Sequence, residues 1–341
     1  MIVGLDIGGT NIRALLIRPE TGEIINRRQE SSAGNENELL SSLTKIIESF
    51  SEVSEKEITG VGLAIAGLIG RDGIVHYSPN LPNLVEFPIG THLQDLTGLP
   101  VFVGNDATAG AWAEAKLGAG REIDNFAFVA LGTGIGTGLV VNKRIVLGAH
   151  GFAGEAGHAT TQSDGPTHIT GLSGSWEYFA SGNALGRLGR EAAQKGKFAL
   201  GLELANSEEQ ITGLHVSEGV FNEDQQSLVI FDEFCRQVAI GISNLITILD
   251  TEEIILGGGL VQIGDQLVSG VEKWLPEFVF GWKHRPKVPV RLAELGIDAG
   301  SLGAGLLINE MRKDNKRSLV RNTYHSPHLP AQVKQSLYLF G

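Results

Sequence analysis

Val103-Gly104-Asn105-Asp106-Ala107-Thr108-Ala109-Gly110 is the stretch around which this chain is organised. The apolar run from Leu99 to Val103 predicts a buried strand that ends at Gly104, and a helical pattern of small apolar residues begins at Ala107. Asp106 therefore sits at a strand-to-helix junction. An Asp at such a junction can serve as an N-cap that accepts a backbone hydrogen bond. Taken alone the stretch favours this cap, whereas the glycine-rich turns elsewhere in the chain favour a chemical role.

The first of these turns joins two predicted strands at the N-terminus. Ile2 to Leu5 and Ile12 to Ile17 are apolar strands, and Asp6-Ile7-Gly8-Gly9-Thr10-Asn11 lies between them. Gly8 and Gly9 let the main chain approach a ligand closely, and successive N–H groups of such a turn can bind a phosphate. The simpler interpretation is a plain hairpin turn. Asp6 and Thr10 favour the phosphate site, because a carboxylate can hold hydrated Mg²⁺ and a hydroxyl can donate to phosphate.

A second turn repeats this layout. Phe126 to Leu131 predicts a strand, Gly132-Thr133-Gly134-Ile135-Gly136-Thr137-Gly138 a turn, and Leu139 to Val141 the next strand. Two such hairpins could hold a polyphosphate from opposite sides. A dinucleotide-binding fold needs a helix after its glycine-rich turn, and here a strand follows each time. The Lys-Ser/Thr signature of a P-loop is also absent from the sequence.

Composition narrows the class of protein. At 341 residues and 42% hydrophobic content, the chain can bury a large core and is long enough for two domains. A formal net charge of −12 argues against a nucleic-acid or anionic-membrane partner. Cys235 is the single cysteine, which excludes a disulfide framework and a cysteine metal cluster. There is no apolar run of membrane-spanning length and no signal peptide, so we expect a cytoplasmic protein.

The remaining elements alternate in the manner of an α/β protein. Ile58 to Ala66 predicts a buried strand ending at Gly67, and a polar, proline-bearing loop at 78–83 carries Asn80 as either a ligand contact or an Asx-turn residue. A third glycine turn, Gly257-Gly258-Gly259, follows the strand Glu253 to Leu256. Further strands are expected at 23–29 and 74–77, and helices at 36–50, 91–96, 183–195, 223–250, 265–275 and 302–312.

Glu155 and His158 stand in the stretch 148–158, which is too rich in glycine for a stable helix. Polar side chains held in such a loop suit the binding of a hydroxylated ligand. Glu177 follows further along the chain.

Five motifs in this order and spacing resemble the ROK family, which contains sugar kinases and repressors of the actin-like ATPase superfamily. They are Asp6-Ile7-Gly8-Gly9-Thr10, Gly104-Asn105-Asp106-Ala107, Leu131-Gly132-Thr133-Gly134-Ile135-Gly136, Gly154-Glu155-Ala156-Gly157-His158 and Leu256-Gly257-Gly258-Gly259. The resemblance implies an α/β fold of two ribonuclease-H-like lobes with an interlobe cleft. We expect the first lobe at 1–115, joined by a returning helix at about 300–315, the second at 116–299, and a tail of unknown role at 316–341.

The resemblance also implies an ATP-dependent hexose kinase, and it assigns roles to residues. Asp106 is the expected general base, because a sugar hydroxyl is a poor nucleophile and needs a positioned base. ATP with Mg²⁺ would bind at the three turns, through Asp6, Gly8, Gly9, Thr10, Asn11, Gly132, Thr133, Gly134, Gly257, Gly258 and Gly259, with Asp6 on the metal through water. The sugar would contact Gly67, Asn80, Asn105, Asp106, Glu155, His158 and Glu177. A homodimer or larger homo-oligomer is expected.

Alternatives stay open at this stage. Glucose is the first expected substrate, and fructose, mannose or an N-acetylhexosamine could replace it, as polyphosphate could replace ATP. A sugar-responsive regulator of the same family would need a DNA-binding helix-turn-helix before the first strand, which starts at Ile2. A sugar-binding protein without catalysis is disfavoured by the presence of Asp6 and Asp106.

One departure from the family concerns zinc. Most ROK relatives bind a structural zinc through a histidine and three cysteines, and here those cysteine positions hold His168, Thr170 and Ser175. Thr and Ser are not normal zinc ligands. Only His158 and His168 remain as ligands, with Asp164 as a third candidate. We therefore expect no structural zinc.

Overall fold

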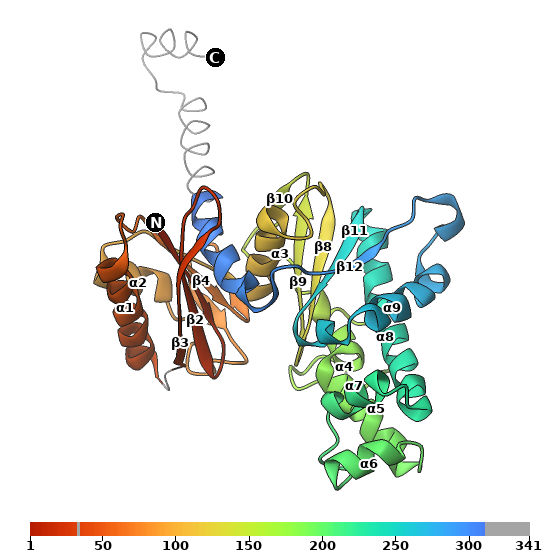
Figure 1. Cartoon of the computed structure of the whole chain (residues 1–341). Helices are drawn as coiled ribbons and strands as arrows, with labels where there is room; N and C mark the ends of the chain where they lie inside the picture. The colour runs from red at the N-terminus through yellow and green to blue at the C-terminus, as the bar shows by residue number, and fades with distance from the viewer. Residues whose placement is uncertain (33–34, 311–341) are drawn as a thin grey trace.

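The computed structural model describes residues 1–32 and 35–310. Two five-stranded sheets stand side by side, each with its own helices (Figure 1). The first sheet has the order β3-β2-β1-β4-β7. Its strands are β1 (Ile2–Ile7), β2 (Asn11–Ile17), β3 (Ile24–Ser31), β4 (Val61–Ile65) and β7 (Val101–Asn105). The first three form antiparallel hairpins, whereas β4 and β7 run parallel to β1.

Opposite faces of the first sheet are covered by different helices. Helices α1 (Glu36–Val53) and α2 (Ile89–Thr97) pack on the face that includes Val3 and Leu5. A helix over residues 299–310 packs on the other face, against Ile2 and Leu15. A short ribbon of β5 (Leu68–Ile69) and β6 (Val75–Tyr77) follows β4.

Glycines in the sheet allow the 299–310 helix to lie directly on the strands. A Cβ placed on Gly4 would lie 1.9 Å from the carbonyl oxygen of Ser301, and one on Gly62 would lie 1.8 Å from that of Ala304. No larger residue fits at either position without moving the helix, since real Cβ atoms do not approach backbone so closely. We call this sheet with its helices the first lobe.

The second sheet repeats the hairpin-plus-parallel plan in the order β10-β9-β8-β11-β12. It comprises β8 (Phe126–Leu131), β9 (Ile135–Val141), β10 (Arg144–Ile145), β11 (Glu253–Gly257) and β12 (Val290–Leu292). Hairpin β8–β9 is antiparallel, and β11 is parallel to β8. We call this sheet and its helices the second lobe.

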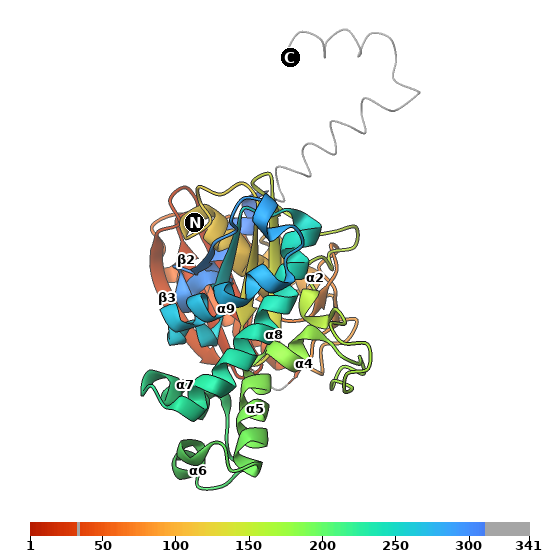
Figure 2. The same ribbon diagram turned by 90° about the vertical axis from the view of Figure 1, so that its right-hand side faces the viewer.

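Six helices build the core of the second lobe on one face of that sheet (Figure 2). They are α4 (Trp176–Ala180), α5 (Gly182–Gln194), α6 (Ala199–Ala205), α7 (Gly213–Phe221), α8 (Gln225–Leu249) and α9 (Asp265–Phe278). Short 3₁₀ turns lie at η1 (Ala156–His158), η2 (Gly259–Ile263), η3 (Trp282–His284) and η4 (Gly296–Asp298). The long helix α8 buries Phe231, Val238 and Ile242, as its apolar stripe predicts.

Helix α3 (Asp106–Leu117) lies between the two sheets. Its Ala109, Trp112 and Ala113 pack with the first lobe and the 299–310 helix, whereas Ala111 packs against β8 and β9. Both lobes therefore hold this helix, which fixes where its N-terminal end lies.

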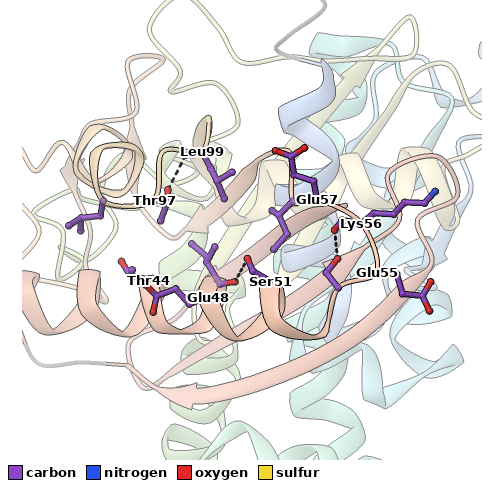
Figure 3. Close-up of a pocket in the computed structure, with 12 residues that line it drawn as sticks. Thr44, Glu48, Ser51, Glu55, Lys56, Glu57, Thr97 and Leu99 are labelled. Atoms are coloured by element: carbon purple, nitrogen blue, oxygen red, sulfur yellow. Dashed lines mark hydrogen bonds between the residues drawn. The ribbon is translucent and has the colours of Figure 1, made fainter.

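The α/β class and both hairpins agree with the sequence predictions, and strands β4, β7 and β11 lie where apolar runs predicted buried strands. The predicted strand Leu139–Val141 was too short, because the turn spans only Gly132–Gly134 and β9 already begins at Ile135. The tail expected at 316–341 lies outside the described residues. A groove between α1 and α2, lined among others by Thr44 and Leu99, contains none of the expected site residues (Figure 3). No helix within the described residues is long and apolar enough to cross a membrane.

Candidate active site

The junction between β7 and α3 places two polar residues side by side. Asn105, and not Asp106, is the N-cap of α3: its Oδ1 accepts from the N–H of Ala107 at 2.9 Å and of Thr108 at 3.1 Å. The simpler interpretation of Asp106 as the cap is wrong by one position: Asn and Asp cap equally well, and the cap is Asn105. The Nδ2 of Asn105 also donates to the carbonyl of Gly67 at 3.2 Å, which joins two expected sugar residues.

Asp106 is consequently the first residue inside the helix. Its Oδ1 accepts from the N–H of Ala107 at 2.9 Å. Burial raises the pKa of Asp106 above its ordinary value, and the Ala107 hydrogen bond opposes that rise. A carboxylate with a raised pKa at a fixed helix start is suited to accept a proton.

Asp6 lies at the end of β1, close to Asp106. Burial and the negative charge of Asp106 raise the pKa of Asp6, the nearby Arg13 opposes the rise, and the pKa is about 6. Asp6 and Arg13 are paired across the β1–β2 hairpin, with Oδ2 and Nη1 3.6 Å apart. Two neighbouring half-buried carboxylates fit a hard divalent cation such as Mg²⁺, which would relieve their repulsion. The sequence analysis missed Arg13, although counting residues back across the hairpin would have found it.

The first glycine turn meets the loop that carries Asn80. The N–H of Gly8 donates to the carbonyl of Asn11 at 2.9 Å, and Asn11 Nδ2 donates to Thr10 Oγ1 at 3.0 Å. A Cβ on Gly9 would lie 3.0 Å from the carbonyl oxygen of Asn80. The structure thus places Asn80 beside the phosphate turn, and no hydrogen bond joins it to the site carboxylates within the described residues.

The second and third turns lie together at the end of β8. A Cβ on Gly258 would lie 2.4 Å from the carbonyl oxygen of Leu131, and Gly258 has a φ of 83°, so this position requires glycine. Gly132 accepts from the N–H of Gly182, the first residue of α5, at 2.7 Å. Thr133 is exposed at the tip, and Gly257 and Gly259 flank Gly258. The backbone N–H groups of these two turns, together with the N-terminus of α5, suit phosphate binding.

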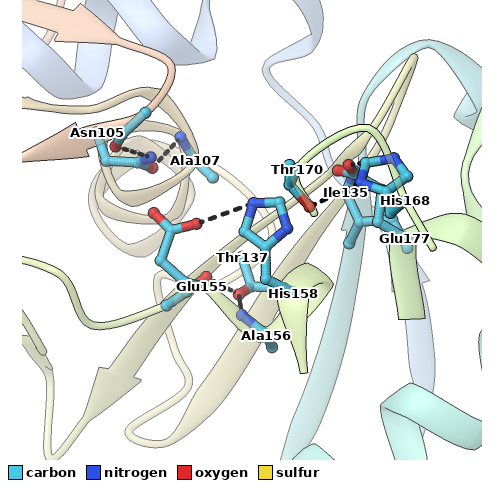
Figure 4. Close-up of polar contacts among 12 residues, drawn as sticks. Asn105, Ala107, Ile135, Thr137, Glu155, Ala156, His158, His168, Thr170 and Glu177 are labelled. Carbon is cyan, nitrogen blue, oxygen red and sulfur yellow. Dashed lines mark hydrogen bonds and ion pairs between the residues drawn. The ribbon is translucent and has the colours of Figure 1, made fainter. Parts of the chain in front are cut away.

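Glu155 directly precedes η1, and His158 is its last residue. Figure 4 shows both between Asn105 of the first lobe and Glu177 of the second. His158 Nε2 is 3.7 Å from Glu155 Oε2. Burial, together with the negative charges of Asp106 and Glu177, raises the pKa of Glu155 to about 7. Thr137, which the sequence analysis did not single out, fixes this loop: its Oγ1 donates to the carbonyl of Gly154 and accepts from the N–H of Ala156.

Glu177 completes the cluster from the first turn of α4. Its Oε2 accepts from the N–H of Ile135 at 2.7 Å, directly after the second glycine turn. A Cβ on Gly134 would lie 2.3 Å from that oxygen, so glycine is needed there for the carboxylate to approach. Its Oε1 lies 3.4 Å from His168 Nε2. Charge interactions therefore link Asp6, Asp106, Glu155 and Glu177 in one acidic cluster.

The zinc that the family resemblance implies needs four nitrogen or sulfur ligands. Of the four corresponding positions, Thr170 and Ser175 offer only hydroxyls. His158, His168 and Glu177 offer ligand atoms within 4.8 Å of one another, which makes three donors. Two of these three already pair with each other. The residues present therefore do not fit a closed four-coordinate zinc, and Asp164 is not part of this group.

Two α/β lobes that each start with a glycine-rich hairpin, with a buried carboxylate on the helix between them, define a phosphotransferase site of the actin-like ATPase type. Residues 2–311 match the family model of the ROK family. The chain belongs to the ROK family.

Its relatives include sugar kinases and a putative xylose repressor from Caldicellulosiruptor sp.. The chain is 31% identical over 314 residues to the glucokinase of Streptomyces coelicolor, covering 91% of this chain and 98% of that one. It is 28% identical to the N-acetylmannosamine kinase of Haemophilus influenzae, covering 93% and 98%. The structure of a ROK family glucokinase from Streptomyces griseus in complex with glucose and AMPPNP superposes with a TM-score of 0.79 at 31% identity, covering 90% and 98%. The expected ATP-dependent sugar kinase with two lobes is confirmed.

Proposed function

We propose that this protein transfers the γ-phosphoryl group of ATP to a hexose hydroxyl, with glucose as substrate and glucose 6-phosphate as product. The observation that carries the proposal is the placement of Asp106, a carboxylate with a raised pKa at the start of the helix that both lobes hold. The glucokinase relatives and the glucose complex of the Streptomyces griseus enzyme support glucose as the sugar.

The reaction needs only one proton transfer by a side chain. Asp106 takes the proton of the sugar hydroxyl as its oxygen attacks the γ-phosphorus. A new O–P bond forms, the bond from the γ-phosphorus to the β–γ bridging oxygen breaks, and ADP leaves with the electron pair. Oδ1 of Asp106 stays fixed by the Ala107 N–H, so the carboxylate keeps its orientation during the transfer.

Phosphates would be held by the glycine turns. The N–H groups of Gly8 and Gly132 already donate within their turns, to the carbonyls of Asn11 and Gly134. Other N–H groups of the two turns, including those of Gly9 and Gly134, would donate to the β- and γ-phosphates, and Gly257–Gly259 would lie towards the nucleoside. Thr10, Asn11 and Thr133 add polar side chains at the same turns. Mg²⁺, held through water by Asp6, would neutralise charge on the phosphates.

The sugar would lie among the polar groups of the acidic cluster. Asn105, Glu155, His158 and Glu177 offer acceptors and donors, and Gly67 and Asn80 close the site from the first lobe. A buried polar group left without its hydroxyl partner carries a large penalty, so this set can discriminate between hexoses.

A coupled assay tests the proposal across a panel of sugars and phosphoryl donors. Glucose with ATP should give the highest kcat/KM among glucose, fructose, mannose, N-acetylmannosamine and N-acetylglucosamine. A higher kcat/KM with another sugar would show that glucose is not the preferred substrate, and a higher one with polyphosphate would show that ATP is not the preferred donor. Sugar binding with no turnover on any donor would support the non-catalytic regulator instead. The cytoplasmic location and the homo-oligomer stay predictions.

A further inference from the structure

His168 occupies a position that has no role in the phosphoryl transfer described above. It lies in a tight turn: its N–H donates to the carbonyl of Leu172 at 2.7 Å, and its own carbonyl accepts from Gly171 at 2.9 Å. Gly171 has a φ of 83°, which favours glycine and closes the turn. Both backbone groups of His168 are therefore occupied, and the ring packs edge-on against Tyr178.

Both ring nitrogens of His168 have partners. Nδ1 lies 3.0 Å from Thr170 Oγ1, and Nε2 lies 3.4 Å from Glu177 Oε1. The Thr170 hydroxyl can either donate or accept, so the arrangement is satisfied in both the neutral and the protonated ring. The side chains of His168 and Glu177 are only 17% and 15% exposed, so solvent screens their contact weakly.

Glu177 carries this contact on to the second glycine turn. One oxygen faces His168, and the other accepts from the N–H of Ile135 at the start of β9. In Figure 4 His168 and Glu177 lie next to Ile135, and His158 lies on the side of Glu155. A continuous chain of polar contacts thus runs from Thr170 through His168 and Glu177 to the turn at Gly132–Gly134.

We propose that His168 is a positioning residue, which holds the Glu177 carboxylate against the second glycine turn without a metal ion. Because Glu177 would face the sugar and the turn would face the phosphates, this contact fixes the distance between the two halves of the site. Part of this statement, the effect on the sugar, rests on the proposed kinase function. The contact replaces the tie that a zinc ion would make between the 159–175 segment and the sheet. A carboxylate oriented before the sugar arrives loses less conformational freedom on binding.

Three variants separate positioning from general damage. His168→Leu removes both ring contacts. His168→Gln keeps a side-chain N–H that can reach Glu177 and should restore most of the loss. Ile169→Ala is the matched control in the same turn, because Ile169 is 96% exposed.

Kinetics provide the first measurement. His168→Leu should raise the KM for hexose about tenfold and change the KM for ATP less, because the polar contact of His168 with the Glu177 carboxylate is lost. The effect should nearly vanish in a Glu177→Gln background, where the partner has already changed. Equal effects of His168→Leu in both backgrounds, or no rescue by Gln, would overturn the proposal.

Amide exchange gives a second measurement that needs no activity. The N–H of Ile135 should exchange about tenfold faster in His168→Leu and unchanged in Ile169→Ala, as followed by NMR. If the wild-type protein phosphorylates no sugar, the proposed function is wrong. The exchange rate of Ile135 still shows whether His168 holds Glu177 against the turn. Metal analysis of the purified protein is the third measurement. About one zinc per chain in the wild type, lost in His168→Leu, would show that a metal ion, and not the His168–Glu177 contact, holds the 159–175 segment.

Discussion

The carboxylate of Glu114 accepts a hydrogen bond from the N–H of Leu295 at 2.9 Å, although the two residues are 181 positions apart. It also accepts from the N–H of Glu294 at 3.2 Å and of Ala119 at 2.8 Å, and Glu114 is fully buried. One side chain at the end of α3 therefore holds both segments by which the chain passes between its lobes.

Removal of this carboxylate should destabilise the protein strongly. Glu114→Ala removes the acceptor of three backbone N–H groups from a fully buried position, and we expect the free energy of unfolding to fall by about 3 to 5 kcal/mol. Urea unfolding measures the change. Glu48→Ala, at an exposed position on α1, is the matched control and should change stability by less than about 0.5 kcal/mol. A loss no larger than that of the control would mean that water replaces the carboxylate.

Asp106→Asn tests the general base. Asn keeps an oxygen that can accept from Ala107 but cannot take a proton at neutral pH, so kcat should fall about 10²- to 10⁴-fold. Hexose affinity, measured by calorimetry, should change far less. Near-normal turnover would restrict Asp106 to a structural role at the helix start.

Glu155→Ala tests the sugar side of the site. Hexose binding should weaken about tenfold or more, because a hydroxyl loses a charged acceptor, while the affinity for an ATP analogue persists. Calorimetry with each ligand in turn checks both expectations. An unchanged hexose affinity would remove Glu155 from the site.

Stability should depend on pH through the same residue. The pKa of Glu155 is about 7 in the folded protein and 4.5 as the ordinary value, so the folded state holds a proton that the unfolded state has released between these pH values. The free energy of unfolding should therefore fall as pH rises from about 4.5 to about 7. Glu155→Gln should flatten this slope in urea titrations at pH 5, 6 and 7.5, and a slope equal to that of the wild type would contradict the assignment.

Sequence reasoning succeeded where local chemistry decides the outcome. Glycine turns between apolar runs predicted both hairpins, and the junction at Asp106 was placed correctly to within one residue. Family resemblance brought Glu155, His158 and Glu177 together, as the structure does. The roles of these residues stay predictions.

What the sequence did not reveal depends on contacts between distant segments. Glu114 would pass for an ordinary surface glutamate of an alanine-rich helix, because its acceptor role arises only where loops near residues 119 and 295 converge on it. Thr137 and His168 are similar: each acts on a loop whose course is set by packing rather than by propensity. Asn105 and not Asp106 is the cap because the helical backbone begins at Asp106. The sequence could not show this, since Asn and Asp are equally good capping residues.

The first sheet is synthesised long before the 299–310 helix that packs on one of its faces. Strands β1 to β7 and helix α3 leave the ribosome first, yet the part of the apolar face that the 299–310 helix covers, around Ile2 and Leu15, lacks that helix until the whole second lobe has been made. For nearly 200 residues of elongation this face is open to other nascent chains and to chaperones, at the usual rate about ten to forty seconds. The glycines at positions 4 and 62 keep the surface flat and ready for the last helix to dock.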